Sequence, residues 1–167
     1  MIGPRGGLPS LIAPGSASYP TGALLLTLVV AALLVALCFA VHLAVMERLA
    51  RRVYRHEVPL RHPLRPVLLS LFAAHLVEVL LFAATLSAFD WAGYGTLAGA
   101  VSSGPDWFVD HFYFSISSYT TLGIGDIVAQ GPIRLLVGVE ALLGLVLVAW
   151  SASFAYLVME RIWGTRG

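Results

Sequence analysis

The chain has 167 residues, of which 59% are hydrophobic and only 11% are charged, and its formal net charge is +1. Because a soluble domain has roughly a quarter charged residues, this composition indicates an integral membrane protein. The small net charge excludes the strongly basic surface of a nucleic-acid-binding protein. The single cysteine, Cys38, lies in an apolar run, cannot form an internal disulfide and is expected to pack in a core.

Residues 1–20 are rich in Gly, Pro and Ser and are expected to form an external, mobile tail. Residues 21–47 form the first apolar run, whose uncharged part would make a helix about 37 Å long, enough to cross a ~30 Å hydrocarbon core. The run is too long for the core of a signal peptide. We expect His42 to lie at the membrane interface near the end of this helix; a haem-binding pair with His75 is the alternative.

Residues 48–66 change character, because arginines crowd into them and Pro59, Pro63 and Pro66 break any helix. The arginines of this segment are Arg48, Arg51, Arg52, Arg55, Arg61 and Arg65. By the positive-inside rule this loop is cytoplasmic. The first span therefore runs from outside to inside, and the N-terminus is expected to be external.

Residues 67–89 form the second span, which carries His75 and Glu78 three positions apart and so on one face of a helix. Ionisable groups in the middle of a membrane are costly and face protein or water. The pair is expected either to fix helix packing as a buried polar contact or to act in gating or proton sensing. Whether Glu78 also meets Glu140 on the last span is left open by the sequence.

Residues 90–131 form an external segment that contains a short helix, residues 106–118, with Asp106 as its N-cap and Asp110 in its first turn. At about 20 Å this helix is too short to span, which indicates a re-entrant loop buried in protein or lining a wet cavity. The carboxyl end of the helix carries a partial negative charge, which favours a cation nearby.

Residues 132–159 form the third span, and residues 160–167 form a tail whose two arginines agree with a cytoplasmic C-terminus. The first span has no regularly spaced arginines, so we expect no voltage sensor. Glu140 and Gly144, in the third span, are candidates for gating. Gly144 is expected to act either as a hinge or as a small residue for close helix packing.

Between the short helix and the third span, the segment 120–126 alternates glycine with bulky apolar residues behind two threonines. Glycine adopts positive φ angles, so Gly123 and Gly125 let neighbouring carbonyl groups point to one side of an extended ribbon. Several such ribbons around an axis would make rings of oxygen that replace the hydration shell of a cation.

The segment reads Thr-Thr-Leu-Gly-Ile-Gly-Asp, and it resembles the selectivity-filter signature T-T-V-G-Y-G-D of the potassium channel family at five of seven positions. The resemblance covers roughly residues 67–159. It implies an all-α membrane protein with three transmembrane helices, a re-entrant pore helix and a filter loop, in the manner of a two-transmembrane pore domain, of bacterial type, with one extra N-terminal helix.

The resemblance also implies which groups bind the permeant ion. K+ is expected to bind the backbone carbonyls of Thr121, Leu122, Gly123 and Ile124, together with the Thr121 hydroxyl, and Gly125 completes the filter. No cofactor other than the permeant K+ is expected. Ile124 replaces the usual tyrosine and cannot donate the hydrogen bond that braces the ribbon, so weak selectivity is an open alternative.

Further residues are expected to support the filter. Asp126 is expected either to form a ring of charge at the outer mouth or to bond to the pore helix, and we favour the second role. Thr120 is expected to face the helix behind the filter or the inner cavity. Tyr113 and Phe114 are expected to form a stiff cuff, and Ser117 lies on the same helix.

Because the chain has one filter segment and no internal repeat of it, the resemblance implies a homotetramer in the lipid bilayer, with residues 67–89 outside and residues 132–159 lining the pore. We expect a potassium-selective channel of the cell membrane, not an enzyme. The alternatives are a weakly selective monovalent cation channel, a membrane scaffold or channel subunit that does not conduct alone, and haem-dependent electron transfer through His42 and His75.

Overall fold

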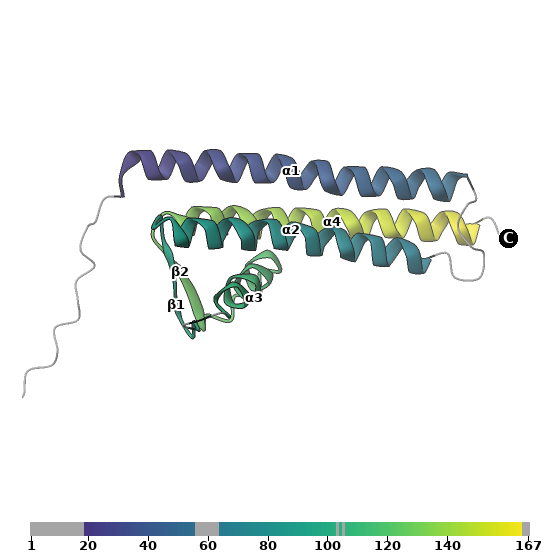
Figure 1. The fold of residues 1–167 in the computed structure, drawn as a ribbon. Helices are drawn as coiled ribbons and strands as arrows, with labels where there is room; N and C mark the ends of the chain where they lie inside the picture. The colour runs from purple at the N-terminus through teal and green to yellow at the C-terminus, as the bar shows by residue number, and fades with distance from the viewer. Residues whose placement is uncertain (1–18, 56–63, 103, 105, 165–167) are drawn as a thin grey trace, which may run out of the picture.

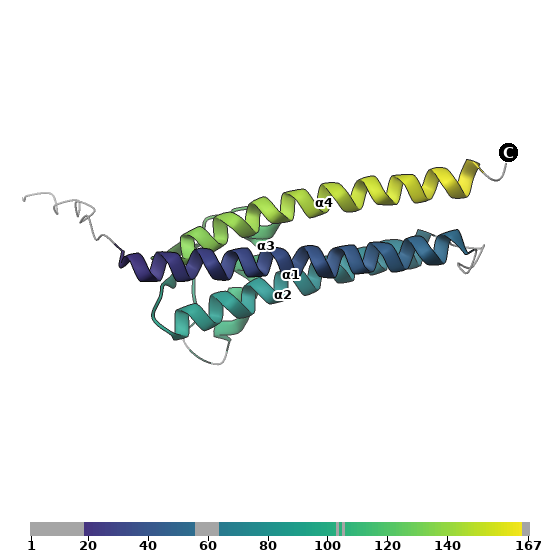
Figure 2. The ribbon, with the colours of Figure 1, turned by 90° about the horizontal axis from the view of Figure 1, so that it is seen from above.

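The computed structural model describes residues 19–55, 64–102, 104 and 106–164. Three long helices lie along one another in it: α1 (Thr21–Tyr54), α2 (Leu64–Trp91) and α4 (Ile133–Gly164) (Figure 1). Each contains a stretch long and apolar enough to cross a membrane, as expected of the three apolar runs. Seen from above, α1 lies over α2, and α4 diverges from both toward its C-terminal end (Figure 2).

The helices extend beyond the apolar runs from which they were predicted. Arg48, Arg51 and Arg52 lie on the last turns of α1 and not in a loop, and Arg51 pairs with Glu47 one turn earlier at 3.3 Å. Arginine is a good helix former, so the helix continues after the apolar residues end. Pro66 lies in the first turn of α2, where its missing N–H is not needed. Several sites named above lie outside the described residues: residues 1–18, Pro59, Arg61, Pro63 and residues 165–167 of the tail.

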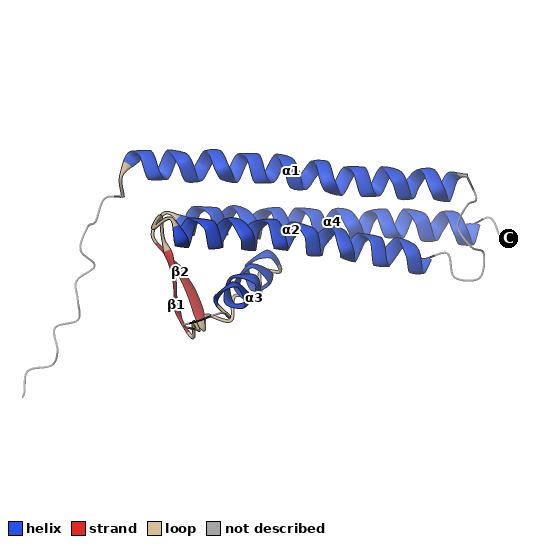
Figure 3. Ribbon diagram, in the orientation of Figure 1, coloured by secondary structure: helices blue, strands red, loops and turns tan. Residues whose placement is uncertain are grey.

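The segment between α2 and α4 contains a small sheet that the all-α expectation missed (Figure 3). Strand β1 (Thr96–Gly99) pairs antiparallel with β2 (Ile127–Gln130), and the helix α3 (Trp107–Tyr119) lies between them in the chain. Strands of four residues this far apart leave too short a hydrophobic alternation to be recognised. Gly99 is required in this sheet, since a Cβ atom there would lie 2.1 Å from the Asp126 carbonyl oxygen.

Two apolar clusters hold the bundle together. The first joins all four helices to the sheet, and its members include Leu34, Cys38, Phe82, Phe114 and Leu147. The second lies toward the other end of the long helices, and its members include Met46, Leu49, Val67, Leu71 and Val158. Cys38 is fully buried, as expected. Because α1 contributes to both clusters, it is an integral part of the bundle.

Candidate functional site: the loop after helix α3 and the polar cluster behind it

Helix α3 is short and inclined to the three long helices (Figure 1). Asp106 occupies the N-cap position, but its side chain makes no capping hydrogen bond. Asp110, in the first turn, accepts a hydrogen bond from the backbone N–H of Ser102 at 2.6 Å. The aligned peptide dipoles of α3 place partial negative charge at its C-terminal end, toward the loop that follows, and Asp110 lies favourably at the opposite, positive end.

The loop from Thr120 to Asp126 alternates in backbone conformation. The φ angle is +58° at Thr121, +52° at Gly123 and +87° at Gly125, and in the described residues Thr121 is the only one other than glycine with a positive φ. Each change in the sign of φ turns a peptide plane, which is the backbone alternation expected for a ribbon whose carbonyl groups point to one side. The sequence predicted this conformation at the two glycines and missed it at Thr121.

Hydrogen bonds from α3 hold the beginning of this loop. The backbone N–H groups of Thr121 and Leu122 donate to the carbonyls of Ser118 and Ser117, each at 2.9 Å. Ser117 therefore supports the loop through its main chain. The Thr120 hydroxyl donates to the Ile116 carbonyl at 2.7 Å, so it closes the last turn of α3. These hydrogen bonds fix the start of the loop against the C-terminal end of α3.

At the other end of the loop, the side chain of Asp126 makes two contacts. It accepts hydrogen bonds from the Tyr113 hydroxyl at 2.9 Å and from the Ile127 N–H at 3.0 Å. Donation to this carboxylate raises the pKa of the Tyr113 phenol above its ordinary value. The contact with α3 is the role favoured for Asp126 from the sequence. Phe114 is buried in the apolar cluster, while the side chains of Leu122 and Ile124 are 65% and 59% exposed in the single chain.

Gly144 lies where α4 crosses the end of α3. A Cβ atom at this position would lie 2.0 Å from the carbonyl oxygen of Tyr119. Gly144 therefore allows α4 to pack closely against the end of α3, which is the second of the two roles expected from the sequence.

Glu140 is fully buried and shares the hydroxyl of Ser115 with the Val79 carbonyl. Ser115 has a single hydroxyl proton, and a carbonyl can only accept. Both contacts are satisfied if Ser115 donates to Val79 and a protonated Glu140 donates to Ser115. Glu140 thus contacts Ser115 of α3. Ser115 in turn contacts the α2 backbone at Val79, and the hydrogen bonds of Glu78 go to other partners, His42 and Tyr119.

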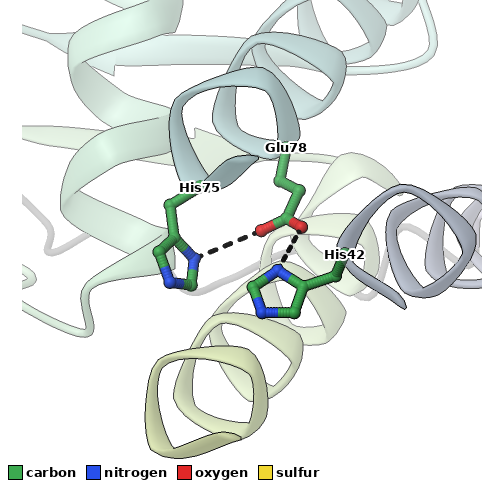
Figure 4. Close-up of side chains that lie close together, drawn as sticks. All are labelled: His42, His75 and Glu78. Atoms are coloured by element: carbon green, nitrogen blue, oxygen red, sulfur yellow. Dashed lines mark hydrogen bonds and ion pairs between the residues drawn. The ribbon is translucent and has the colours of Figure 1, made fainter. Parts of the chain in front are cut away.

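A second group of polar side chains, here called the polar ring, consists of His42, His75, Glu78, Tyr119 and Ser151. His42 of α1 lies 2.8 Å from Glu78 of α2, and His75 lies 3.3 Å from the same carboxylate (Figure 4). The Tyr119 hydroxyl donates to Glu78 at 2.5 Å and lies 2.8 Å from His75. Ser151 of α4 lies 3.0 Å from a ring nitrogen of each histidine.

The expectation that His42 lies near the end of its helix is wrong, and its side chain is fully buried inside the bundle. The error arose because α1 continues to Tyr54, which places His42 well before the helix end. The polar ring lies along the helices between the two apolar clusters: on α1, His42 falls between Cys38 and Met46.

The polar ring also bears on cofactor and metal binding. His42, His75 and Glu78 offer donor atoms within 4.8 Å of one another, the one such group in the described parts of the chain. Each of these atoms already takes part in a hydrogen bond to a protein group. The two imidazole rings have centroids 5.0 Å apart and share Ser151, which leaves no room for a porphyrin between them. The haem alternative does not fit this geometry.

Tyr119, Ser115 and Ser151 were not identified from the sequence. Tyr119 directly precedes the filter segment, and Ser151 is an isolated hydroxyl in an apolar span. Neither pattern is distinctive, because their partners come from other helices.

The filter loop and most members of the polar ring lie in a part of the chain that matches a known protein family. A family model described as an ion channel matches residues 74–161, which is more than half of the chain. The match runs from within α2 through α3 and the loop into α4 and leaves α1 outside. Comparisons with curated proteins and with solved structures gave no match. The chain therefore belongs to the ion channel family.

Proposed function

We propose that this protein conducts K+ passively across the cell membrane through a filter built from the loops of four identical chains. The single observation that supports the proposal is the positive φ at Thr121, Gly123 and Gly125, an alternation that suits a ribbon with its backbone carbonyls on one side. A stack of such carbonyls offsets the loss of an ion's water shell without any charged side chain. The ion sites are the carbonyls of residues 121–124 and the Thr121 hydroxyl.

The assembly follows from the geometry of one chain. A single ribbon cannot surround an ion, and the chain contains one ribbon. Leu122 and Ile124, on either side of Gly123, are largely exposed in the isolated chain, and so is much of the apolar surface of α4. Neighbouring chains around a fourfold axis would cover these side chains and bring the ribbons face to face.

The orientation follows from the arginines. Arg48, Arg51 and Arg52 lie at the end of the bundle opposite the sheet and α3, where α4 also ends (Figure 1). By the positive-inside rule this end faces the cytoplasm, so the filter and the N-terminus face outward.

The test is ion flux through liposomes that carry only the purified protein. We expect K+ efflux from these liposomes, none from protein-free liposomes, and loss of the flux in Gly123→Ala and Thr121→Ala. Native mass spectrometry in mild detergent is expected to give a tetramer. A folded tetramer that passes no cation would favour the scaffold alternative, and a monomer or dimer would contradict the proposed pore.

A second candidate is a weakly selective cation channel. The observation that favours it is Ile124, which has no hydroxyl to brace the ribbon from behind. Reversal potentials measured with K+ on one side and Na+ on the other decide between the two. Strong discrimination against Na+ supports the potassium channel, and equal permeability supports the alternative.

A further inference from the structure

The polar ring is closed, so its protons can be counted. Going round it, Glu78 contacts His42, His42 contacts Ser151, Ser151 contacts His75, His75 contacts Tyr119, and Tyr119 contacts Glu78. These are five contacts, at distances from 2.5 to 3.0 Å. Each contact is a hydrogen bond only if one proton lies in it. A complete ring therefore requires five protons.

The five side chains can supply this total of five protons in two arrangements, which differ only in where the last proton lies. The hydroxyls of Ser151 and Tyr119 bring one proton each. The remaining three must be shared among His42, His75 and Glu78. Two neutral imidazoles bring two, so the third makes one imidazolium beside an ionised Glu78, or resides on Glu78 itself. In either arrangement the net charge of the ring is zero.

Any other proton count breaks a contact. With one proton fewer, two lone pairs face each other across about 3 Å; with one more, two hydrogens point into the same gap. Both states also leave a net charge in a buried site, which is costly. The ring therefore has a single protonation level at which all of its bonds exist, and it opens when the pH moves far enough in either direction.

Other titratable groups face the ring from the neighbouring helices. Cys38 of α1 lies one turn before His42, and Glu140 of α4 lies near Tyr119 and Cys38. Glu140 is bonded to Ser115 of α3, and the hydrogen bonds of the ring join its five members to one another. Trp150 stacks on His42 with ring centroids 6.2 Å apart and contributes no titratable group.

The ring contacts the filter through Tyr119. Its hydroxyl belongs to the ring, and its carbonyl lies against Gly144 of α4. The next residue, Thr120, closes the last turn of α3 through its hydroxyl. The first N–H groups of the filter loop then donate to the carbonyls of Ser117 and Ser118. Opening the ring weakens the hold of the ring on Tyr119, which lies at the end of α3 directly before the filter loop.

We propose that His42 is a positioning residue for the filter: from α1, outside the region matched to the ion channel family, it closes the ring that holds Tyr119. This inference rests on the proposed conduction. It gives α1 a role beyond anchoring, because without His42 the ring loses its link between Glu78 and Ser151.

The experiment measures K+ flux in liposomes as a function of pH, with the same pH on both sides. The wild type is expected to conduct best at intermediate pH and to lose about ten-fold or more toward both acid and alkaline pH, following the opening of the ring. In His42→Gln, at least one limb of this profile is expected to move by about one pH unit or more. The matched control is His111→Gln, because His111 is also a buried histidine but pairs with Asp90 at 3.1 Å, away from the ring. This control is expected to keep both limbs.

Two results would overturn the inference. One is a conducting wild type whose pH profile coincides with that of His42→Gln, or does not depend on pH. The other comes from the wild type alone, which covers the case in which His42→Gln does not fold. Nitrogen NMR of histidine-labelled protein and infrared spectra of the carboxyl groups count the ring protons directly. Neutral His42 and His75 with an ionised Glu78, at the pH of maximal flux, contradict the count.

The same data distinguish this inference from the proposed function. A wild type that carries no ion at any pH contradicts the conduction on which both rest. A conducting wild type with an unchanged His42→Gln profile contradicts only the role of His42.

Discussion

The filter loop and the polar ring lie next to each other and use opposite kinds of chemistry. In the proposed pore the loop uses backbone oxygens; it has glycine at two of its three positions of positive φ and leaves its side chains largely exposed in the single chain. The ring is built from five side chains, of which Glu78 and His42 are completely buried. In the proposed pore the loop would bind K+ without any charged side chain, whereas the ring joins ionisable and hydroxyl side chains of four helices.

This comparison predicts that the ring carries more of the stability and the loop more of the conduction. The largest expected effect on stability is that of Glu78→Ala. Removing one partner of a buried charged pair costs about 3–5 kcal/mol, since His42, His75 and Tyr119 lose their common acceptor. The measurement is thermal or denaturant unfolding in detergent followed by circular dichroism.

Glu47→Ala is the control for Glu78→Ala. Glu47 also pairs with a basic side chain, Arg51, but both are exposed, so its loss is expected to cost about 0–1 kcal/mol. Equal losses of stability in the two variants would mean that burial of the ring adds nothing to the fold.

Gly144→Ala is expected to have the next largest effect. Its new methyl group would lie 2.0 Å from the Tyr119 carbonyl, so α3 and α4 must move apart, and overpacking of this kind costs about 1–3 kcal/mol. Gly138→Ala is the matched control on the same helix, with no atom within 4 Å of the new carbon, and helix propensity should make it neutral or slightly stabilising. If Gly144→Ala unfolds at the same temperature as Gly138→Ala, the close contact is not part of the folded protein.

Gly123→Ala is expected to affect conduction much more than stability. Nothing lies within 4 Å of the new carbon, so the cost is the strained φ of +52°, about 1–2 kcal/mol. K+ flux in liposomes is expected to fall to background, because the next carbonyl turns away. Gly93→Ala carries a similar strain, with φ of +77° and open space around it, but lies outside the loop, so its flux should be unchanged. A loss of flux in both variants would point to strain in general and not to the filter.

The loop is a local segment and the ring joins residues far apart in the chain, and this difference explains what the sequence could predict. The filter is a local segment, and the three spans are long apolar runs, so both could be read directly. The ring joins residues up to 109 positions apart on four helices. His75 and Glu78 were recognised as a pair because they share a helical face, but their partners depend on how α1, α3 and α4 pack. The two four-residue strands were missed for the same reason, as their pairing is not local.

The smallest expected effect is that of Tyr113→Phe at the outer end of the filter. Its phenol is exposed and donates to Asp126, which raises the pKa of the phenol, so the bond exists in the protonated form. Any support it gives is complete below the ordinary tyrosine pKa of about 10 and is lost only as the pH rises through the raised value. Tyr113→Phe should therefore change flux only slightly at neutral pH and leave both limbs of the ring's pH profile in place. Ultraviolet titration checks the cause: Asp126→Ala should lower the pKa of Tyr113, and an unchanged titration would show that this hydrogen bond does not form.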